Sequence, residues 1–281
     1  MLYCHVGVKR TASICRASLA AALLAAICVL CALPTAAGAD QSVHLTAALT
    51  PKRLGAGTTI HFGFTVLVPP GQVPVPIRQI DLLYPRGLGI ATSGLGISTC
   101  DAAVLEAQGP PGCPPNSLMG YGLGTVEVPF GPQLLQETAR TATFMAPVHN
   151  GRLGLLFYAN GETPVAAQLV FPGLVLPASD PFGGDLNALL PLVPTLPEAP
   201  DAALVKLTTT LGPSHITYFE FKKGERLPYH PQGILLPPTC PRGGFRFAAR
   251  FVFADGTRTD AYATVACPPR RRSLRARHPH H

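Results

Sequence analysis

The chain has 281 residues, of which 28 are Gly and 31 are Pro. Their share, about 21% against an ordinary ~12%, excludes an architecture of long helices and favours short strands joined by many turns. Charged residues make up only 13% of the chain and hydrophobic residues 47%. This composition argues against intrinsic disorder, because it supplies enough apolar side chains for a core.

The formal net charge of +7 is concentrated at the two ends of the chain. Three of the 22 basic residues precede position 17 and five follow position 269, which leaves 14 basic residues against all 15 acidic ones in between. The segment 40–269 therefore has a net charge of about −1 (14 − 15). A basic face that binds nucleic acid is not expected on it.

The N-terminus has the organisation of a secretory signal. Basic residues at positions 9, 10 and 16 precede the apolar run 19–33, and small residues follow at 37–39. This order predicts a signal peptide, residues 1–39, that is cleaved after Ala39. A membrane anchor is the alternative, but the run is shorter than the ~20 residues that span a bilayer. We therefore expect an extracellular or cell-wall-associated protein with no transmembrane segment after signal removal.

Alternation of apolar and polar residues marks the first strands of the mature chain. Residues 43–49 and 60–66 alternate with period two, which predicts two half-buried strands. A segment spaced by prolines then leads to a third strand, 80–84, which Pro85 ends. A glycine-rich loop follows at 87–98.

One short helix is expected in this chain, at 101–108, where two turns end at Gly109 and the prolines behind it. Strands are predicted to resume at 125–129 and 141–146.

Two Asn-Gly pairs then predict consecutive hairpins. Asn150-Gly151 leads into a strand at 153–158, and Asn160-Gly161 leads into another at 165–170. Hairpins in sequence favour an antiparallel meander over a parallel crossover sheet.

The proline-rich segment 177–200 is predicted to be a long loop that covers one end of a sheet, since a linker between domains is normally more polar. Strands are expected again at 203–211 and 216–221.

The last hairpin has the clearest pattern. Phenylalanines at 245, 247, 251 and 253 recur with period two, and Asp255-Gly256 turns the chain. A two-residue loop would place Phe251 opposite Asp260, so that a polar face of the second strand would lie opposite the apolar face of the first. A three-residue loop, 254–256, with the glycine in the left-handed conformation places Phe251 opposite Thr259 instead, and we predict this register.

Four cysteines follow the predicted cleavage site, Cys100, Cys113, Cys240 and Cys267. An even number in an exported chain implies disulfides, and the spacings of 13 and 27 match no common zinc pattern. We predict the local pairs Cys100 with Cys113, around the helix, and Cys240 with Cys267, which closes the last hairpin.

No motif identifies a reaction: nucleophile elbow, zinc helix, phosphate loop and calcium loop are all absent from the sequence.

His44 and His61 would face each other across neighbouring strands if the loop at 51–54 is tight, as two metal ligands would, but solvated histidines are the simpler interpretation. Asp180 and Asp185 flank a glycine-rich loop and could bind calcium; turn formation explains them more simply.

Two further pairs of side chains are candidates for functional groups. Asp255 and Asp260 could act as paired carboxylates of a hydrolase, although the turn explains the first and a solvent-facing strand position the second. Tyr218 and Tyr262 could stack on a sugar in a chain that has no Trp.

Several short motifs resemble secreted proteins of high-GC actinobacterial genomes. They are Cys100-Asp101 with a short helix through Leu105, the run 112–117, the Gly-rich start 120–124, and the closing Cys240-Pro241, Asp255-Gly256 and Cys267-Pro268. The resemblance implies an exported β-sandwich of uncharacterised activity and provides no catalytic residues.

The sequence therefore predicts an all-β protein: one antiparallel β-sandwich domain of immunoglobulin-like architecture over 40–269, with one short helix, a long Pro-rich loop and a disordered basic tail at 270–281. We expect a non-enzymatic, disulfide-stapled structural or binding module at the cell surface, with no cofactor or metal and no nucleic acid partner. Its tail either contacts anionic cell-wall polymer or is inert. The alternative is a secreted hydrolase or glycan-binding protein with its site in the end loops near 177–200.

Overall fold

The computed structural model describes residues 41–90, 98–212, 216–230 and 234–269. The predicted signal peptide with its cleavage after Ala39 and the predicted tail at 270–281 lie outside these residues. The described strands are β1 (Ser42–Thr50), β2 (Gly57–Leu67), β3 (Ile77–Pro85), β4 (Gly89–Ile90), β5 (Leu118–Phe130), β6 (Gln133–His149), β7 (Arg152–Gly161), β8 (Ala167–Leu176), β9 (Phe182–Leu189), β10 (Ala203–Leu211), β11 (Tyr218–Lys222), β12 (Glu225–Tyr229), β13 (Ile234–Leu235), β14 (Phe245–Phe253) and β15 (Arg258–Val265).

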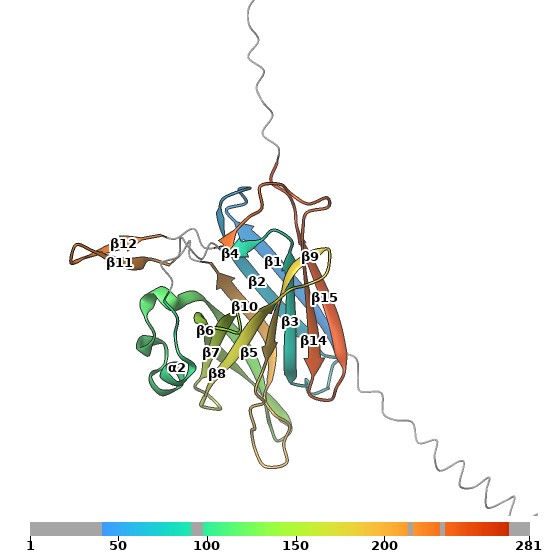
Figure 1. Ribbon diagram of the computed structural model, residues 1–281. Coiled ribbons are helices and arrows are strands. Elements are labelled where there is room, and N and C mark those ends of the chain that lie inside the picture. The colour runs from blue at the N-terminus through green and yellow to red at the C-terminus, as the bar shows by residue number, and fades with distance from the viewer. Residues whose placement is uncertain (1–40, 91–97, 213–215, 231–233, 270–281) are drawn as a thin grey trace, which may run out of the picture. The chain divides into compact units, whose positions relative to one another are not determined.

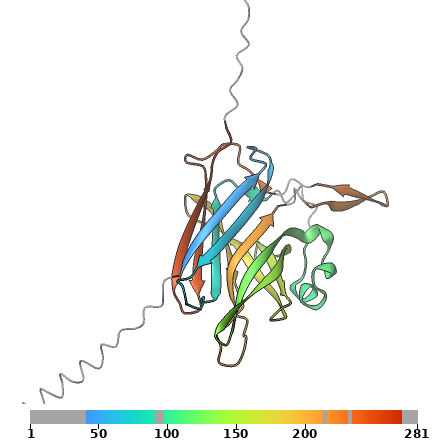
Figure 2. The same ribbon diagram turned by 180° about the vertical axis from the view of Figure 1, so that it is seen from behind.

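Thirteen of the described strands form one antiparallel sheet (Figure 1). Its order is β15-β14-β3-β9-β8-β7-β6-β5-β10-β2-β13-β4, and β1 pairs with β2 beside this path. β1 also lies beside β15, at the other end of this order (Figure 2). There the Thr259 hydroxyl on β15 donates a 2.8 Å hydrogen bond to the Gln41 carbonyl just before β1. The sheet is therefore nearly closed and barrel-like. The all-β antiparallel prediction is confirmed; an immunoglobulin-like sandwich of two separate sheets is not.

The phenylalanines of β14 form one packed wall of the interior. Those at 245, 247, 251 and 253 are each exposed by 1% or less. Phe251 meets Phe64 of β2 edge to face, with ring centroids 5.0 Å apart. The predicted register is confirmed, since Phe251 lies opposite Thr259 and the turn has Gly256 at φ 86°.

Glycines on β5 allow the sheet to curl at its contact with β10. Gly120 and Gly122 alternate on one side of β5, and a Cβ atom at either would overlap a carbonyl oxygen of β10, that of Thr210 or Thr208. Only a residue without a side chain permits so close an approach. The glycine alternation that begins β5 is therefore a packing requirement.

The helix α2 (Ala102–Gln108) covers the outer face of the sheet. The Asp101 carboxylate accepts a hydrogen bond from the Ala103 amide and caps the helix, while Gly109 ends it, as predicted. Leu105 is fully buried and packs with Phe144 and Leu156 of the sheet. Two short 3-10 turns, η2 (Pro110–Gly112) and η3 (Pro115–Ser117), lead from the helix into β5.

Two disulfides link the chain locally. Cys100–Cys113 brackets α2 across 13 residues, and Cys240–Cys267 joins the two ends of the last hairpin across 27. These are the two pairs predicted from the sequence. The first belongs to the buried cluster under the helix, whereas Cys267 of the second is exposed.

The strands β11 and β12 form a separate two-stranded sheet. Tyr218 is fully buried at its base, where its hydroxyl donates to the Leu118 carbonyl, and Asn116 bonds to both backbone groups of Phe219. A two-stranded hairpin is marginal alone in water, so these contacts hold it to the start of β5.

Two sequence predictions about loops are wrong. The segment 177–200 contains the strand β9, which pairs with β3 and β8, so that only residues 177–181 and 190–200 lie outside the named strands. Asn160-Gly161 forms no turn but belongs to the end of β7, paired with β6 and β8. The connection from β7 to β8 is instead the segment 162–166.

The role of the β5 glycines can be tested with Gly122→Ala. The added methyl group would overlap the Thr208 carbonyl, so we expect the free energy of unfolding to fall by about 1–3 kcal/mol. Gly89→Ala is the matched control, because no heavy atom of the described residues lies within 4 Å of its Cβ position. Denaturant unfolding of both variants measures the difference, and equal stability would contradict the close approach of β5 and β10.

Candidate functional site

The half of the interior opposite the Phe wall is hollow. Successive side chains of β7 and β8 point to opposite faces of the sheet. The face that borders the interior carries the β7 residues Leu153, Leu155, Phe157, Ala159 and Gly161. Several of these side chains are small, and two cavities lie against this face. We name them by one residue each, the Glu137 cavity and the Met119 cavity.

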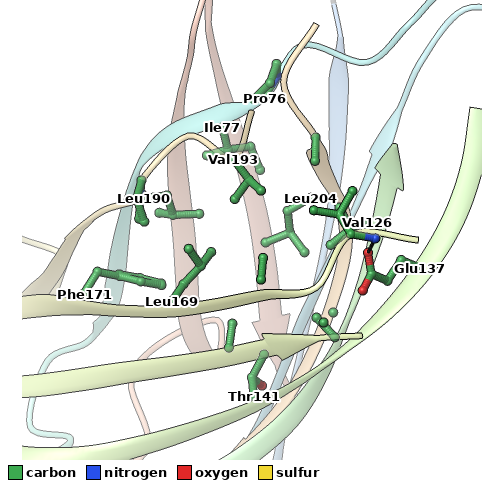
Figure 3. A pocket seen from close by; sticks show the side chains of 18 residues that line it. Pro76, Ile77, Val126, Glu137, Thr141, Leu169, Phe171, Leu190, Val193 and Leu204 are labelled. Carbon is green, nitrogen blue, oxygen red and sulfur yellow. Dashed lines mark hydrogen bonds between the residues drawn. The ribbon is translucent and has the colours of Figure 1, made fainter. Parts of the chain in front are cut away.

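The Glu137 cavity has a volume of about 130 Å³. Figure 3 shows its lining, with Glu137 and Phe171 at opposite sides of the view. Apart from Glu137 and Thr141, its lining side chains are apolar. The lining residues are Pro76, Ile77, Gly124, Val126, Glu137, Ala139, Thr141, Ala159, Gly161, Val165, Ala167, Leu169, Phe171, Leu190, Pro191, Val193, Ala202 and Leu204.

The Met119 cavity is larger, with a volume of about 290 Å³. Among the described residues, its one polar side chain is that of Tyr84, whose ring lies over Gly184 where a Cβ atom would overlap it. Burial and the nearby Asp185 carboxylate raise the pKa of Tyr84, so its hydroxyl is neutral. The lining residues are Ile60, Leu82, Tyr84, Leu88, Gly89, Met119, Leu153, Leu155, Val175, Leu186, Leu211, Ile234 and Phe247.

A pair of stacked phenylalanines separates the two cavities. Phe157 and Phe171 lie opposite each other on β7 and β8, with ring centroids 5.4 Å apart and an interplanar angle of 28°. On β7 the residues before Phe157 line the Met119 cavity and those after it line the Glu137 cavity. The aromatic pair is therefore a partition across the interior.

Glu137 is a buried acid in an apolar wall. Its side chain is 5% exposed and projects inward from β6. One carboxylate oxygen accepts a 3.0 Å hydrogen bond from the Thr163 amide and the other a 3.4 Å bond from the Val165 amide. A Cβ atom at Gly161 would overlap the carboxylate, so this glycine makes room for it. Glu137 thus fastens the connection between β7 and β8 at the cavity edge.

The loop after β9 closes one side of the Glu137 cavity. Leu190, Pro191 and Val193 line it, and Val193 forms an isolated bridge with Ala202 just before β10. The Leu190 amide donates a 2.8 Å bond to the Arg78 carbonyl on β3, which holds the loop across the sheet end. The predicted covering role of the proline-rich segment therefore applies to residues 190–202.

The sequence prediction missed Glu137. It began this strand at Thr141, whereas β6 begins at Gln133 and Glu137 has the same inward parity as Thr141. Extending the period-two pattern backwards from Met145 would have placed a carboxylate on the buried face.

His44 and His61 are not brought together. His44 lies opposite Thr65, and His61 lies opposite Ala48, four residues further along β1. The prediction that they face each other is wrong, because the connection between the strands is longer than the tight loop it assumed. In the part of the chain that the structure describes, no group of three His, Cys, Asp or Glu residues could hold a metal ion.

The structure separates Asp180 and Asp185 in role. Asp180 forms an ion pair of 2.6 Å with Arg86, and both side chains are more than 70% exposed. Asp185 lies on β9, with one carboxylate oxygen buried without a hydrogen-bond partner. Burial, and secondly the Asp81 carboxylate, raise the pKa of Asp185, while Arg250 lowers it.

The remaining candidates have structural roles or stay on the surface. Asp255 accepts bonds from the Thr257 amide and hydroxyl and so caps the last turn. Asp260 lies opposite Arg250 on β14. Tyr218, considered for sugar stacking, is fully buried, and Tyr262 is 68% exposed.

A nearly closed antiparallel sheet around two apolar cavities thus defines the structural class of this protein. Comparison with protein-family models, with curated proteins and with solved structures finds no match. The resemblance to secreted actinobacterial proteins stays a prediction. Across the described ranges, no helix has the length and apolar character needed to cross a membrane.

The state of Asp185 can be tested through pH. A raised pKa means that the folded protein holds this proton more tightly than the unfolded chain, so the contribution to stability is full at acid pH and is lost as the pH rises through the folded pKa. We expect Asp185→Asn to match the wild type at acid pH and to become the more stable protein as the pH rises to 7. Unfolding measured over a pH series, with Asp180→Asn as the exposed control, checks this; a variant less stable than the wild type at pH 7 would contradict it.

Proposed function

We propose that this protein is an exported binding module that holds small apolar molecules inside its barrel-like sheet. The observation that supports this proposal is the pair of cavities beside the Phe157–Phe171 partition, with volumes of about 130 and about 290 Å³. Barrels of this general kind enclose either packed side chains or one small ligand. Here half of the interior is packed and half is hollow.

Hollow space of this size destabilises a folded protein. Interiors are normally packed as densely as organic crystals, with few voids larger than a water molecule. Residues that line such space lose the packing contacts that a filled interior would give them, so each cavity costs free energy of folding. A ligand that fills the space would recover part of it.

Export is supported by the chain itself. The order of basic, apolar and small residues before Asp40 is that of a signal peptide, and the two disulfides are compatible with an oxidising compartment. We extend the proposal to an extracellular or wall-associated location, with the five arginines after position 269 contacting anionic cell-wall polymer.

A secreted hydrolase or glycan-binding protein with a site near 177–200 is the second candidate. The loop 190–202 does border a cavity, which favours ligand contact at this position. The cavity wall is apolar, however, and suits an apolar molecule better than a sugar with many hydroxyl groups.

Binding of naphthalene tests the proposed function, because this rigid apolar probe suits the Met119 cavity. We expect naphthalene to raise the unfolding temperature of the purified protein by mass action. Val175→Phe fills part of that cavity and should abolish the rise, whereas Val148→Phe, at a position 64% exposed on β6, should keep it. Calorimetric titration measures the affinity of the three proteins. No binding to the wild type, or equal binding by Val175→Phe, would contradict the proposal.

A further inference from the structure

The Glu137 cavity joins an apolar chamber to one buried carboxylate. Glu137 is 5% exposed, and the other polar side chain in the lining is Thr141. A ligand seated here therefore meets aliphatic and aromatic groups on nearly all sides and an acid at one. The Glu137 carboxylate therefore determines which polar group a ligand can place at that side of the cavity.

The hydrogen bonds of Glu137 leave acceptor capacity unused. A carboxylate has about four lone-pair sites, and the structure assigns two of them to the Thr163 and Val165 amides. Both partners are neutral backbone groups. Within the described ranges, Arg86 and Asp180 form an ion pair, and no basic side chain there forms one with Glu137.

An uncompensated buried charge favours a cationic ligand. Removing a carboxylate from water costs free energy, and buried charges in proteins are normally paired. In this protein the carboxylate is desolvated by folding, before any ligand arrives, so the ligand has to lose only its own hydration. A protonated amine would supply both the missing positive charge and hydrogen-bond donors.

The volume limits the apolar part of such a ligand. An apolar cavity of about 150 Å³ binds benzene in another protein, and the Glu137 cavity measures about 130 Å³. The body of the ligand is therefore a ring or branched group of about five or six carbon atoms. The Phe157–Phe171 pair bounds it on the side of the Met119 cavity.

We propose that the Glu137 cavity is a binding site for a small organic ammonium ion, with the apolar body of the amine in the chamber and its charged nitrogen on the Glu137 carboxylate. This inference rests on the proposed function, that the interior binds small apolar molecules. It adds the chemical class of the ligand and the residue that selects it. The backbone bonds of Glu137 keep their role of fastening the β7–β8 connection.

A series of four probes with one common ring tests the proposal on the wild-type protein. Cyclopentane, cyclopentanol, cyclopentylamine and cyclopentanecarboxylate share the apolar body and differ in the polar group. By calorimetric titration at pH 7 we expect cyclopentylamine to bind at least about tenfold more tightly than cyclopentane and cyclopentanol, and the carboxylate not to bind, because a charge-assisted hydrogen bond contributes at least that factor.

The variant Glu137→Gln removes the charge and nearly keeps the shape. We expect it to lose the preference for the amine while its affinity for cyclopentane stays the same. Glu127→Gln is the control, since Glu127 lies on the neighbouring strand β5 opposite Gln136 and does not line the cavity, and it should keep the preference. The amide that Glu137→Gln introduces has only one oxygen for two backbone amides, so if this variant fails to fold, the wild-type probe series is the deciding measurement.

The outcomes separate this inference from the proposed function. Binding of naphthalene in the Met119 cavity together with equal affinity for cyclopentylamine and cyclopentane would overturn the ammonium site and leave the apolar interior in place. A preference for the amine that persists in Glu137→Gln would also overturn it. Absence of binding by all probes, naphthalene included, would overturn both.

Discussion

The structure depends on the close contact between β5 and β10. The carbonyl oxygens of Thr208 and Thr210 lie where the Cβ atoms of Gly122 and Gly120 would be, so the two strands can approach only because these positions lack side chains. Without side chains at these positions, β5 can bend, and the sheet curls towards closure between β1 and β15.

Curling brings two unlike halves of the sheet face to face. On one side the phenylalanines of β14 interdigitate with β2, as in the Phe64–Phe251 pair, and form a dense core. On the other side the inward residues of β5–β8 include Gly124, Ala139 and Ala159, which are too small to meet the opposite wall. The cavities follow from this asymmetry of side-chain volume. The same asymmetry leaves room for the Glu137 carboxylate, which Gly161 admits into the wall.

How far the sequence predicts this structure depends on how local the evidence is. The β14–β15 register followed from parity alone, because the register one residue away would have placed Asp260, not Thr259, opposite Phe251. The helix and its end at Gly109 were equally local, whereas the cap at Asp101 was not predicted. β9 was missed because prolines and glycines surround its alternating residues, and its partners β3 and β8 are distant or follow an irregular turn. The cavities could not be predicted, since their existence depends on which strands lie opposite each other across the closed sheet.

Xenon binding tests the central claim, a hollow apolar half of the interior divided by Phe157 and Phe171, most directly. Xenon enters apolar cavities and needs no chemical complementarity, so it reports empty space independently of any ligand preference. In a crystal of the protein under xenon pressure we expect xenon on both sides of the Phe157–Phe171 pair, near Leu169 on one side and near Leu155 on the other. An interior without xenon, filled by side chains from wall to wall, would contradict the account.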